Sequence, residues 1–250
     1  MIKRLVLIFL FIPFLAFPQK EIPYQVGEYS AFDVSFGAII VGHAELEIVE
    51  EKLIDSISIF HIVGKGKTAY FFDWFFKVRD VYETFLDTSK LLPIKFIRDI
   101  NEGPYSKKQN YFFHHSNSIV KHNDTAYKIP FNSQDMLSAL FYARTFNKEE
   151  VKKTSSFFVP IFMDEENYFL EVSYLNNEVI ETEFGKVDCM VFKPKMQEGR
   201  VFEDGEEMKI WISDDKNHLL MKVETKIWAG TIKAVLADYK ELKFPLSIIQ

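Results

Sequence analysis

Cysteine is almost absent from this sequence, and its scarcity excludes two kinds of stabilising chemistry. Cys189 is the single cysteine among 250 residues, so the chain can form neither an internal disulfide nor a cysteine-based metal site. Its neighbours in VDCMVF are apolar and typical of a buried strand. We therefore expect Cys189 to be a buried, inert thiol rather than a nucleophile. The fold must then be stabilised by its hydrophobic core.

Long apolar runs and flexible linkers are also lacking beyond the N-terminus. No later stretch reaches the roughly 20 apolar residues that a spanning helix needs, so we expect no transmembrane span in the mature chain. No segment rich in Pro, Gly or Ser divides the chain, and no repeat or strand–helix–strand alternation is visible. These absences predict a single antiparallel β domain, which we assign to residues 20–250.

Positive charge is in deficit, which bears on the class of partner. The chain carries a net charge of -6. An acidic chain has no general attraction to phosphate backbones, so we do not expect nucleic acid as a partner. The same deficit weakens a purely electrostatic attachment to anionic lipid.

Known catalytic motifs are missing as well. The segment GKGKT at 64–68 has His61 where a phosphate-binding loop needs a glycine. Neither a G-x-S-x-G nor an H-E-x-x-H motif occurs, and the adjacent His114 and His115 would point to opposite faces of a strand. We expect no metal, no cofactor and no enzyme activity. Catalytic carboxylates brought together from separate strands stay open as an alternative.

The N-terminus carries the features of an export signal. Lys3 and Arg4 precede an unbroken apolar run from Leu5 to Phe17, which is too short for a spanning helix. We predict that residues 1–19 are a signal peptide and that the mature protein is periplasmic or associated with the cell envelope. No cysteine follows this leader, so a lipoprotein anchor is not expected.

Period-two alternation dominates the rest of the chain. Polar and apolar residues alternate on both sides of Gly37 in AFDVSFGAIIVGHAELEIVEE, and IWISDDKNHLLMKVE at 210–224 has the pattern of strand, polar turn and strand. YFFDWFF at 70–76 could begin with a short helical turn, and we predict a strand from Phe75 to Leu86. Together these patterns indicate a mainly β fold built from a single antiparallel, strongly curved sheet or barrel.

Only one main covering helix is predicted, from Gln134 to Phe146. Ser133 is a suitable N-cap, and Asp135 would lie in the first turn. An apolar stripe follows at helical spacing, made of Met136, Leu137, Leu140, Phe141 and Ala143. We expect Leu140 and Phe141 to pack on the concave side of the sheet and to close one end of the barrel.

Aromatic residues are abundant, at 16% of the chain. Most should fill the core, because aromatics favour strands. The alternative is that some line an apolar cavity inside the curved sheet, which is a common place for a ligand. The candidates are Phe72, Trp74, Leu140 and Phe141. Such a cavity would hold a lipid, another apolar ligand or a segment of a partner.

Several stretches together resemble one bacterial family. GEYSAFDVSFGAIIVGHAELEI opens the mature chain, the helical QDMLSALFYAR lies near its centre, and DCMVFKPKMQEGRVF and IWISDDKNHLLMKVETKIWAGTIKAVL follow. They are similar to the domain-of-unknown-function family 3108, whose members are exported envelope proteins. The resemblance implies no activity. The order of strands and helix also resembles periplasmic lipoprotein-carrier half-barrels, but likeness of fold does not fix function.

Three functions stay open from the sequence. The first is a non-catalytic envelope protein that holds an apolar ligand or partner segment, which an apolar cavity of several hundred Å³ would favour. The second is a glycan-directed hydrolase, which carboxyl groups about 5–9 Å apart in a polar cleft would favour. The third is a purely structural partner-binding module with a filled interior.

Overall fold

The computed structural model describes residues 21–196, 207–228 and 230–249, so the predicted signal peptide lies outside the described residues. The strands are β1 Tyr29–Phe36, β2 Ile39–Ile54, β3 Ile57–Thr68, β4 Arg79–Asp87, β5 Pro93–Glu102, β6 Tyr105–His114, β7 Ile119–His122, β8 Thr125–Lys128, β9 Ser156–Met163, β10 Glu166–Thr182, β11 Gly185–Met196, β12 Glu207–Ser213, β13 Leu220–Ile227 and β14 Gly230–Lys240.

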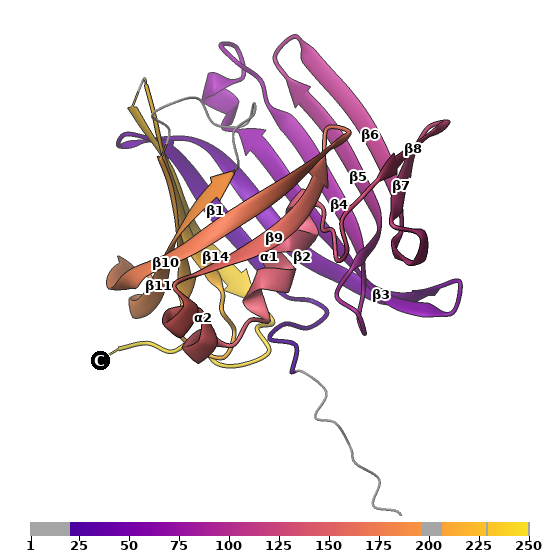
Figure 1. Cartoon of the computed structure of the whole chain (residues 1–250). Coiled ribbons are helices and arrows are strands. Elements are labelled where there is room, and N and C mark those ends of the chain that lie inside the picture. The colour runs from indigo at the N-terminus through magenta and orange to yellow at the C-terminus, as the bar shows by residue number, and fades with distance from the viewer. Residues whose placement is uncertain (1–20, 197–206, 229, 250) are drawn as a thin grey trace, which may run out of the picture.

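These strands form one 14-stranded antiparallel sheet (Figure 1). Its order is β8-β7-β6-β5-β4-β3-β2-β1-β14-β13-β12-β11-β10-β9, so almost every strand pairs with its neighbour in sequence. The exception is β8 and β9, which do not pair, while β1 pairs with β14 as well as β2 and so joins the two halves of the chain. The prediction of a single, strongly curved antiparallel sheet is confirmed. The sheet does not close into a barrel, because β8 and β9 remain its two edges.

The predicted hairpins form where turn residues interrupt the alternation. Gly37 adopts a φ of 60° between β1 and β2, a conformation that glycine reaches without strain. The strand–turn–strand predicted at 210–224 corresponds to β12 and β13. In its turn the Asp215 carboxylate accepts hydrogen bonds from the Ser213 hydroxyl and the Asn217 N–H, which stabilises the reversal.

The strand predicted from Phe75 to Leu86 is wrong at its start. A 3-10 turn, η1 (Tyr70–Phe72), and a loop precede β4, which begins only at Arg79. The Asp73 carboxylate accepts hydrogen bonds from the Thr68 hydroxyl at 2.6 Å and the Arg79 guanidinium at 2.6 Å. This contact ties the two ends of the loop together, so the aromatic run between them has no strand partner.

The main helix is shorter than predicted. α1 spans Met136–Arg144, and Asp135 rather than Ser133 is its N-cap, accepting hydrogen bonds from the N–H groups of Leu137 and Ser138. Gln134 is extended instead, because its backbone bonds with β9 through Pro160 and Phe162. A second helix, α2 (Lys148–Thr154), was not predicted, since its seven residues bury only Val151.

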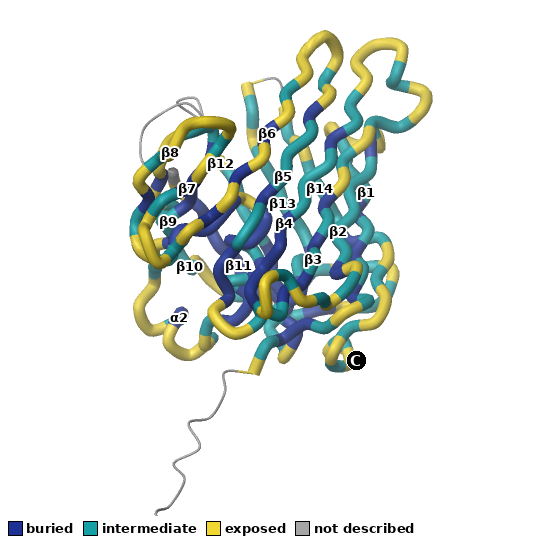
Figure 2. The backbone as a smooth tube through the Cα atoms, turned by 90° about the vertical axis from the view of Figure 1, so that its right-hand side faces the viewer, coloured by how far each residue is buried: buried dark blue, intermediate teal, exposed yellow. Residues whose placement is uncertain are grey.

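α1 lies on the concave side of the sheet and divides the interior. The hydroxyl of Thr84 on β4 donates to the carboxylate of Asp135 at 2.6 Å, which fixes the start of the helix against the sheet. Leu137 and Phe141 enter a core cluster with side chains from β2 to β7, as predicted for Phe141. Figure 2 shows buried positions gathered around this end of the sheet, while strand tips at the other end are exposed.

Side chains, rather than backbone bonds, fill the seam between β8 and β9. Phe162 of β9 packs against Tyr111, Phe113 and Tyr127 at ring-centroid distances of 5.1, 6.4 and 5.6 Å. At the β9–β10 turn Asp164 pairs with Arg98 at 3.0 Å and with Lys107 at 2.6 Å. The open sheet therefore encloses a barrel-like interior.

Candidate functional site

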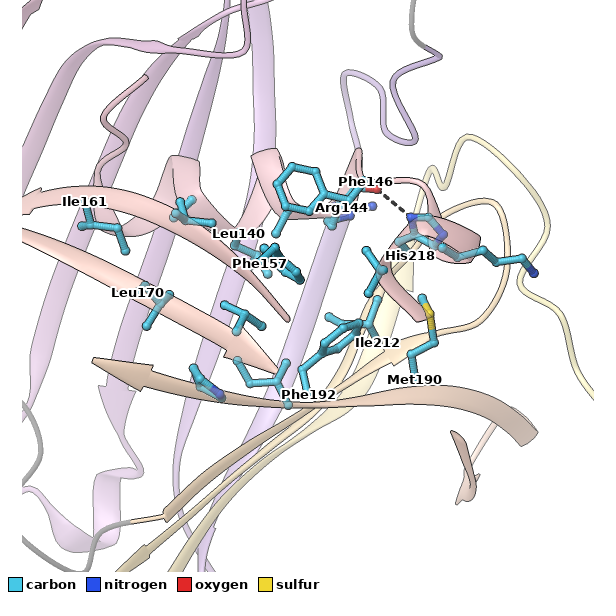
Figure 3. Close-up of a pocket in the computed structure, with 18 of the residues that line it drawn as sticks. Leu140, Arg144, Phe146, Phe157, Ile161, Leu170, Met190, Phe192, Ile212 and His218 are labelled. Carbon is cyan, nitrogen blue, oxygen red and sulfur yellow. Dashed lines mark hydrogen bonds between the residues drawn. The ribbon is translucent and has the colours of Figure 1, made fainter. Parts of the chain in front are cut away.

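A partly enclosed cavity of about 200 Å³ lies between α1, α2 and the β9–β12 end of the sheet (Figure 3). We call it the α1 cavity. Its wall is almost wholly apolar, and side chains from six elements converge on it. Representative members are Leu140 of α1, Val151 of α2, Phe157 of β9, Leu170 of β10, Phe192 of β11 and Ile212 of β12.

The helix leaves this space because its two faces differ in bulk. Leu137 and Phe141 fill the core on one side, while Ala139 and Ala143 present small side chains to the cavity on the other. These two alanines are four residues apart, so they lie on the same face of the helix. Met136 and Leu140 of α1 also border the cavity, and the two alanines leave between them and the strands the space that larger side chains would fill.

The opposite wall follows from strand periodicity. Met190 and Phe192 of β11 line the cavity, whereas the intervening Val191 belongs to a separate cluster with Trp211. Both faces of β11 are thus buried, one against the helices and one against a cluster that includes residues of the C-terminal segment. This double burial explains why the sequence of the strand is almost continuously apolar.

Arg144 lies at the mouth of the cavity as part of a buried ion pair. Its guanidinium bonds with the Glu28 carboxylate at 2.5 and 3.1 Å, and it also donates to the carbonyl of Asn217. His218 Nδ1 donates to the Arg144 carbonyl at 2.6 Å, as Figure 3 marks with a dashed line. Both side chains also line an adjoining open cleft of about 600 Å³.

α2 forms the second side of the mouth and is held by a buried carboxylate. Lys148 and Lys152, one turn apart, bind the Asp214 carboxylate at 3.0 and 2.8 Å. Burial alone would raise the pKa of Asp214, but hydrogen bonds from Lys152, Asn177 and Lys148 lower it to about 2. The charges of this region are therefore engaged with one another, and the cavity itself stays apolar.

The four residues predicted to line a cavity do not lie together in the structure. Leu140 lines the α1 cavity, but Phe141 is buried in the core, with its ring 5.1 Å from that of Tyr24. Phe72 and Trp74 lie in the η1 loop outside the cavity, and Trp74 is 80% exposed. Whether any of the four binds a ligand stays a prediction. The sequence analysis missed the strand residues of the wall. Their alternation is visible in the sequence, but their contact with α1 depends on the fold.

Cys189 is fully buried, as predicted. Burial raises the pKa of its thiol to about 12, with smaller contributions from Asp188 and other nearby carboxylates. A thiol in this state is a poor nucleophile. In the described part of the chain, no group of three or more His, Cys, Asp or Glu side chains is placed to hold a metal ion.

A carboxylate pair from separate strands lies elsewhere on the sheet. Asp80 of β4 alternates with Thr84, which faces α1, so Asp80 is also on the concave side. Burial and the nearby Asp80 carboxylate raise the pKa of Glu102 on β5, while Arg98 opposes the shift. Neither carboxylate lines the α1 cavity.

Comparisons with known proteins give the family and the fold. A profile of the DUF3108 family, described as proteins of unknown function, matches residues 31–237. The chain belongs to the DUF3108 family. The family resemblance predicted from the sequence is therefore confirmed. A search of curated proteins gives no match for this DUF3108 protein.

Among solved structures, this DUF3108 chain is similar to a β-barrel-like DUF1849 protein from Brucella abortus. The TM-score is 0.57 at 8% identity, and the likeness covers 88% of this chain and 99% of that one. At this identity the likeness shows the fold alone.

Two weaker likenesses carry no further argument. A candidate lipoprotein from Parabacteroides distasonis has a TM-score of 0.39 at 12% identity, covering 87% of this chain and 97% of that one. A candidate exported protein with a YmcC-like fold from Bacteroides fragilis has a TM-score of 0.32 at 11% identity, covering 88% and 98%. No helix of the described segments has the length and apolar character needed to cross a bilayer.

Proposed function

We propose that this DUF3108 protein is a non-catalytic, exported envelope protein that holds the apolar part of a ligand in the α1 cavity. The observation that carries the proposal is the cavity itself, an almost wholly apolar space between α1 and four strands. Export is supported by the basic start and the apolar run of the N-terminal leader.

An empty apolar space in a protein interior is unfavourable, so filling it with an apolar ligand lowers the free energy. Protein interiors are normally close-packed, and side chains that line a void lose dispersion contacts. Water gains little there, because an apolar wall offers it no hydrogen bonds. An apolar group that enters from solvent both fills the void and leaves water, so each step favours binding.

The size of the cavity restricts the ligand. Its volume of about 200 Å³ is below the roughly 300–1,000 Å³ of pockets that bury whole drug-sized molecules. It suits an alkyl chain or one apolar side chain, with the remainder of the ligand in the adjoining cleft. We therefore favour an acyl-chain lipid, with a segment of a partner protein as the alternative occupant.

Titration with the apolar dye N-phenyl-1-naphthylamine tests the proposal. Ala143 lines the cavity, so Ala143→Phe should fill it and weaken dye binding at least tenfold. Ala126, exposed on β8, provides the matched control Ala126→Phe, which should bind dye like the native protein. Equal binding by the two variants would place the dye outside the α1 cavity and reject the proposal.

A hydrolase is the second candidate, favoured by the Asp80–Glu102 pair. A carboxyl group with a raised pKa, such as that of Glu102, can serve as a general acid. If this function holds, the protein should release reducing ends from purified envelope glycan, and Glu102→Gln should abolish the release. Absence of release by the native protein would remove this candidate without affecting the cavity proposal.

A further inference from the structure

Large apolar side chains gather on the strand tips at the end of the sheet opposite the α1 cavity. We call this surface the aromatic rim. It comprises Phe36, Ile39 and Ile40 at the β1–β2 turn, Tyr70, Phe71, Trp74, Phe75 and Phe76 in the η1 loop, Tyr105 after the β5–β6 turn, and Trp228 at the β13–β14 turn. Tyr70 and Trp228 are each 92% exposed.

Backbone contacts join the four tips into one surface. The Ala69 N–H donates to the Val41 carbonyl at 2.9 Å, which links the η1 loop to β2. The Gly103 N–H donates to the Lys77 carbonyl at 2.8 Å, which links the same loop to the β5–β6 turn. Between Gly37 and the carbonyl of Thr231 a bond of 3.1 Å joins the β1–β2 and β13–β14 turns.

Two glycines let the aromatic rings lie close to these neighbouring turns. A Cβ atom added at Gly103 would stand 2.7 Å from Phe76, and one added at Gly230 would stand 2.9 Å from Phe36. The rings of Phe76 and Phe36 therefore pack directly against the backbone of these two glycines. Trp74 and Phe75 instead project into solvent, with about four fifths of their surface exposed.

Exposing the aromatic rim to water is unfavourable in free energy, and the backbone holds the rim in a fixed arrangement. Contiguous exposed aromatics of this kind mark an interaction surface in a soluble protein. The Asp73–Arg79 ion pair and the Thr68 hydroxyl brace the η1 loop, so its rings cannot readily fold back into the concavity. The only charged groups in that loop are Asp73, which is paired, and Lys77.

The strands just behind the rim carry many lysine and arginine side chains. Within four residues of the four tips the cations are Lys65, Lys67, Lys77, Arg79, Lys107, Lys108, Lys226 and Lys233. The acids in the same band are Asp33, Asp73, Asp80, Asp99, Glu102 and Glu224. Two of these cations pair with acids just outside the band, Lys67 with Glu45 and Lys107 with Asp164. With those two acids counted, the charges of the band balance, although the whole chain carries a net charge of -6.

We propose that the aromatic rim docks on a lipid bilayer surface. Trp and Tyr favour the headgroup level of a membrane, and Phe and Ile favour the acyl boundary just below it. The band of cations behind the tips would then lie at the level of the lipid phosphates. The rim residues stand on the outer surface of the tips and line neither the α1 cavity nor the adjoining cleft. Docking uses the end of the sheet away from the α1 cavity and does not require that cavity to be occupied.

Flotation with vesicles of phosphatidylethanolamine and phosphatidylglycerol in a 3:1 ratio tests the docking. The double variant Trp74→Ser/Phe75→Ser should lower partitioning at least tenfold. Leu53→Ser is the matched control, because Leu53 is 73% exposed at the opposite end of the sheet, and it should bind like the native protein. Since all three residues are exposed, melting temperatures should agree within a few degrees.

Two further measurements distinguish insertion into the bilayer from purely electrostatic attachment and from self-association. Vesicles with brominated acyl chains should quench Trp74 and Trp228 strongly but spare Trp211, which is 4% exposed. Most binding should persist in 0.5 M NaCl, and Ala143→Phe should dock normally. Full release by salt, equal binding by the double variant, or rim-dependent self-association without vesicle binding would each overturn the proposal.

Discussion

At the scale of the residue, Asp135 is the side chain that fixes α1. Its carboxylate is fully buried and accepts hydrogen bonds from the N–H groups of Leu137 and Ser138 and from the Thr84 hydroxyl. Burial raises its pKa from 3.8 to about 6, and these hydrogen bonds only partly oppose the shift. The helix is therefore capped by a group that is poorly stabilised in its charged form.

This shift predicts a dependence of stability on pH. Because the folded-state pKa of Asp135 lies above the unfolded value, its favourable contribution is full below about pH 4 and is lost as pH rises through about 6. Asp135→Asn retains an oxygen for the cap and removes the charge. Between pH 4 and pH 7, the free energy of unfolding of the variant should rise relative to that of the native protein by on the order of 2–3 kcal/mol. Urea unfolding at both pH values measures this, and parallel pH profiles would contradict it.

Cys189 gives a second prediction at the same scale. Its full burial and its raised pKa predict no reaction with a thiol-specific reagent until the protein unfolds. Cys189→Ser should cost about 1–3 kcal/mol, because the hydroxyl would be poorly satisfied among apolar neighbours. Rapid labelling of the folded protein, or loss of dye binding without loss of stability, would show that the thiol has a chemical role.

At the scale of the element, α1 has one packed face and one face on a cavity. Phe141→Ala should cost about 3–5 kcal/mol, because its ring is buried against Tyr24 and the core. Leu140→Ala should cost less, about 1–3 kcal/mol, since its side chain already borders a void, and dye capacity should rise. Chemical denaturation with parallel dye titration makes the comparison. Equal costs with unchanged dye binding would show that the helix completes an ordinary core.

The sequence predicted the elements better than their ends. Alternation on each side of Gly37 and along 210–224 predicted strands, because period two follows directly from a half-buried sheet. The start of the Phe75 strand was wrong because exposed loop aromatics have the composition of a strand. Ser133 and Asp135 are both good N-caps, and the choice between them depends on the bond of Gln134 with β9, which no local pattern encodes.

At the scale of the whole molecule, curvature and a single sheet were predictable, but the open seam was not. Sequential antiparallel strands follow from short turns and alternation. Whether the last strands meet depends on residues far apart in sequence, such as Arg98 and Asp164, whose pairing spans the gap. For the same reason the α1 cavity could be anticipated as an apolar space near Leu140, while its strand wall could not.

The seam supplies a prediction about access to the interior. Asp164→Ala leaves the half-buried Arg98 without its carboxylate partner, so the β8–β9 seam should loosen at a cost of about 1–3 kcal/mol. Hydrogen exchange of β8 and β9 amides should accelerate at least tenfold, while β1 and β2 stay protected. Asp99→Ala is the control, because Asp99 pairs with Lys108 within the sheet rather than across the seam. Equal exchange in both variants would show that Asp164 does not hold the seam.

Native mass spectrometry of the protein purified from its own envelope tests the central claim most directly. The native protein should carry an adduct with the mass of an acyl-chain lipid, and Ala143→Phe, purified in parallel, should lack it. The Trp74→Ser/Phe75→Ser variant should keep the adduct if the protein still meets its ligand without membrane docking. A bare native protein, or an adduct that persists when Ala143→Phe fills the α1 cavity, would contradict the account.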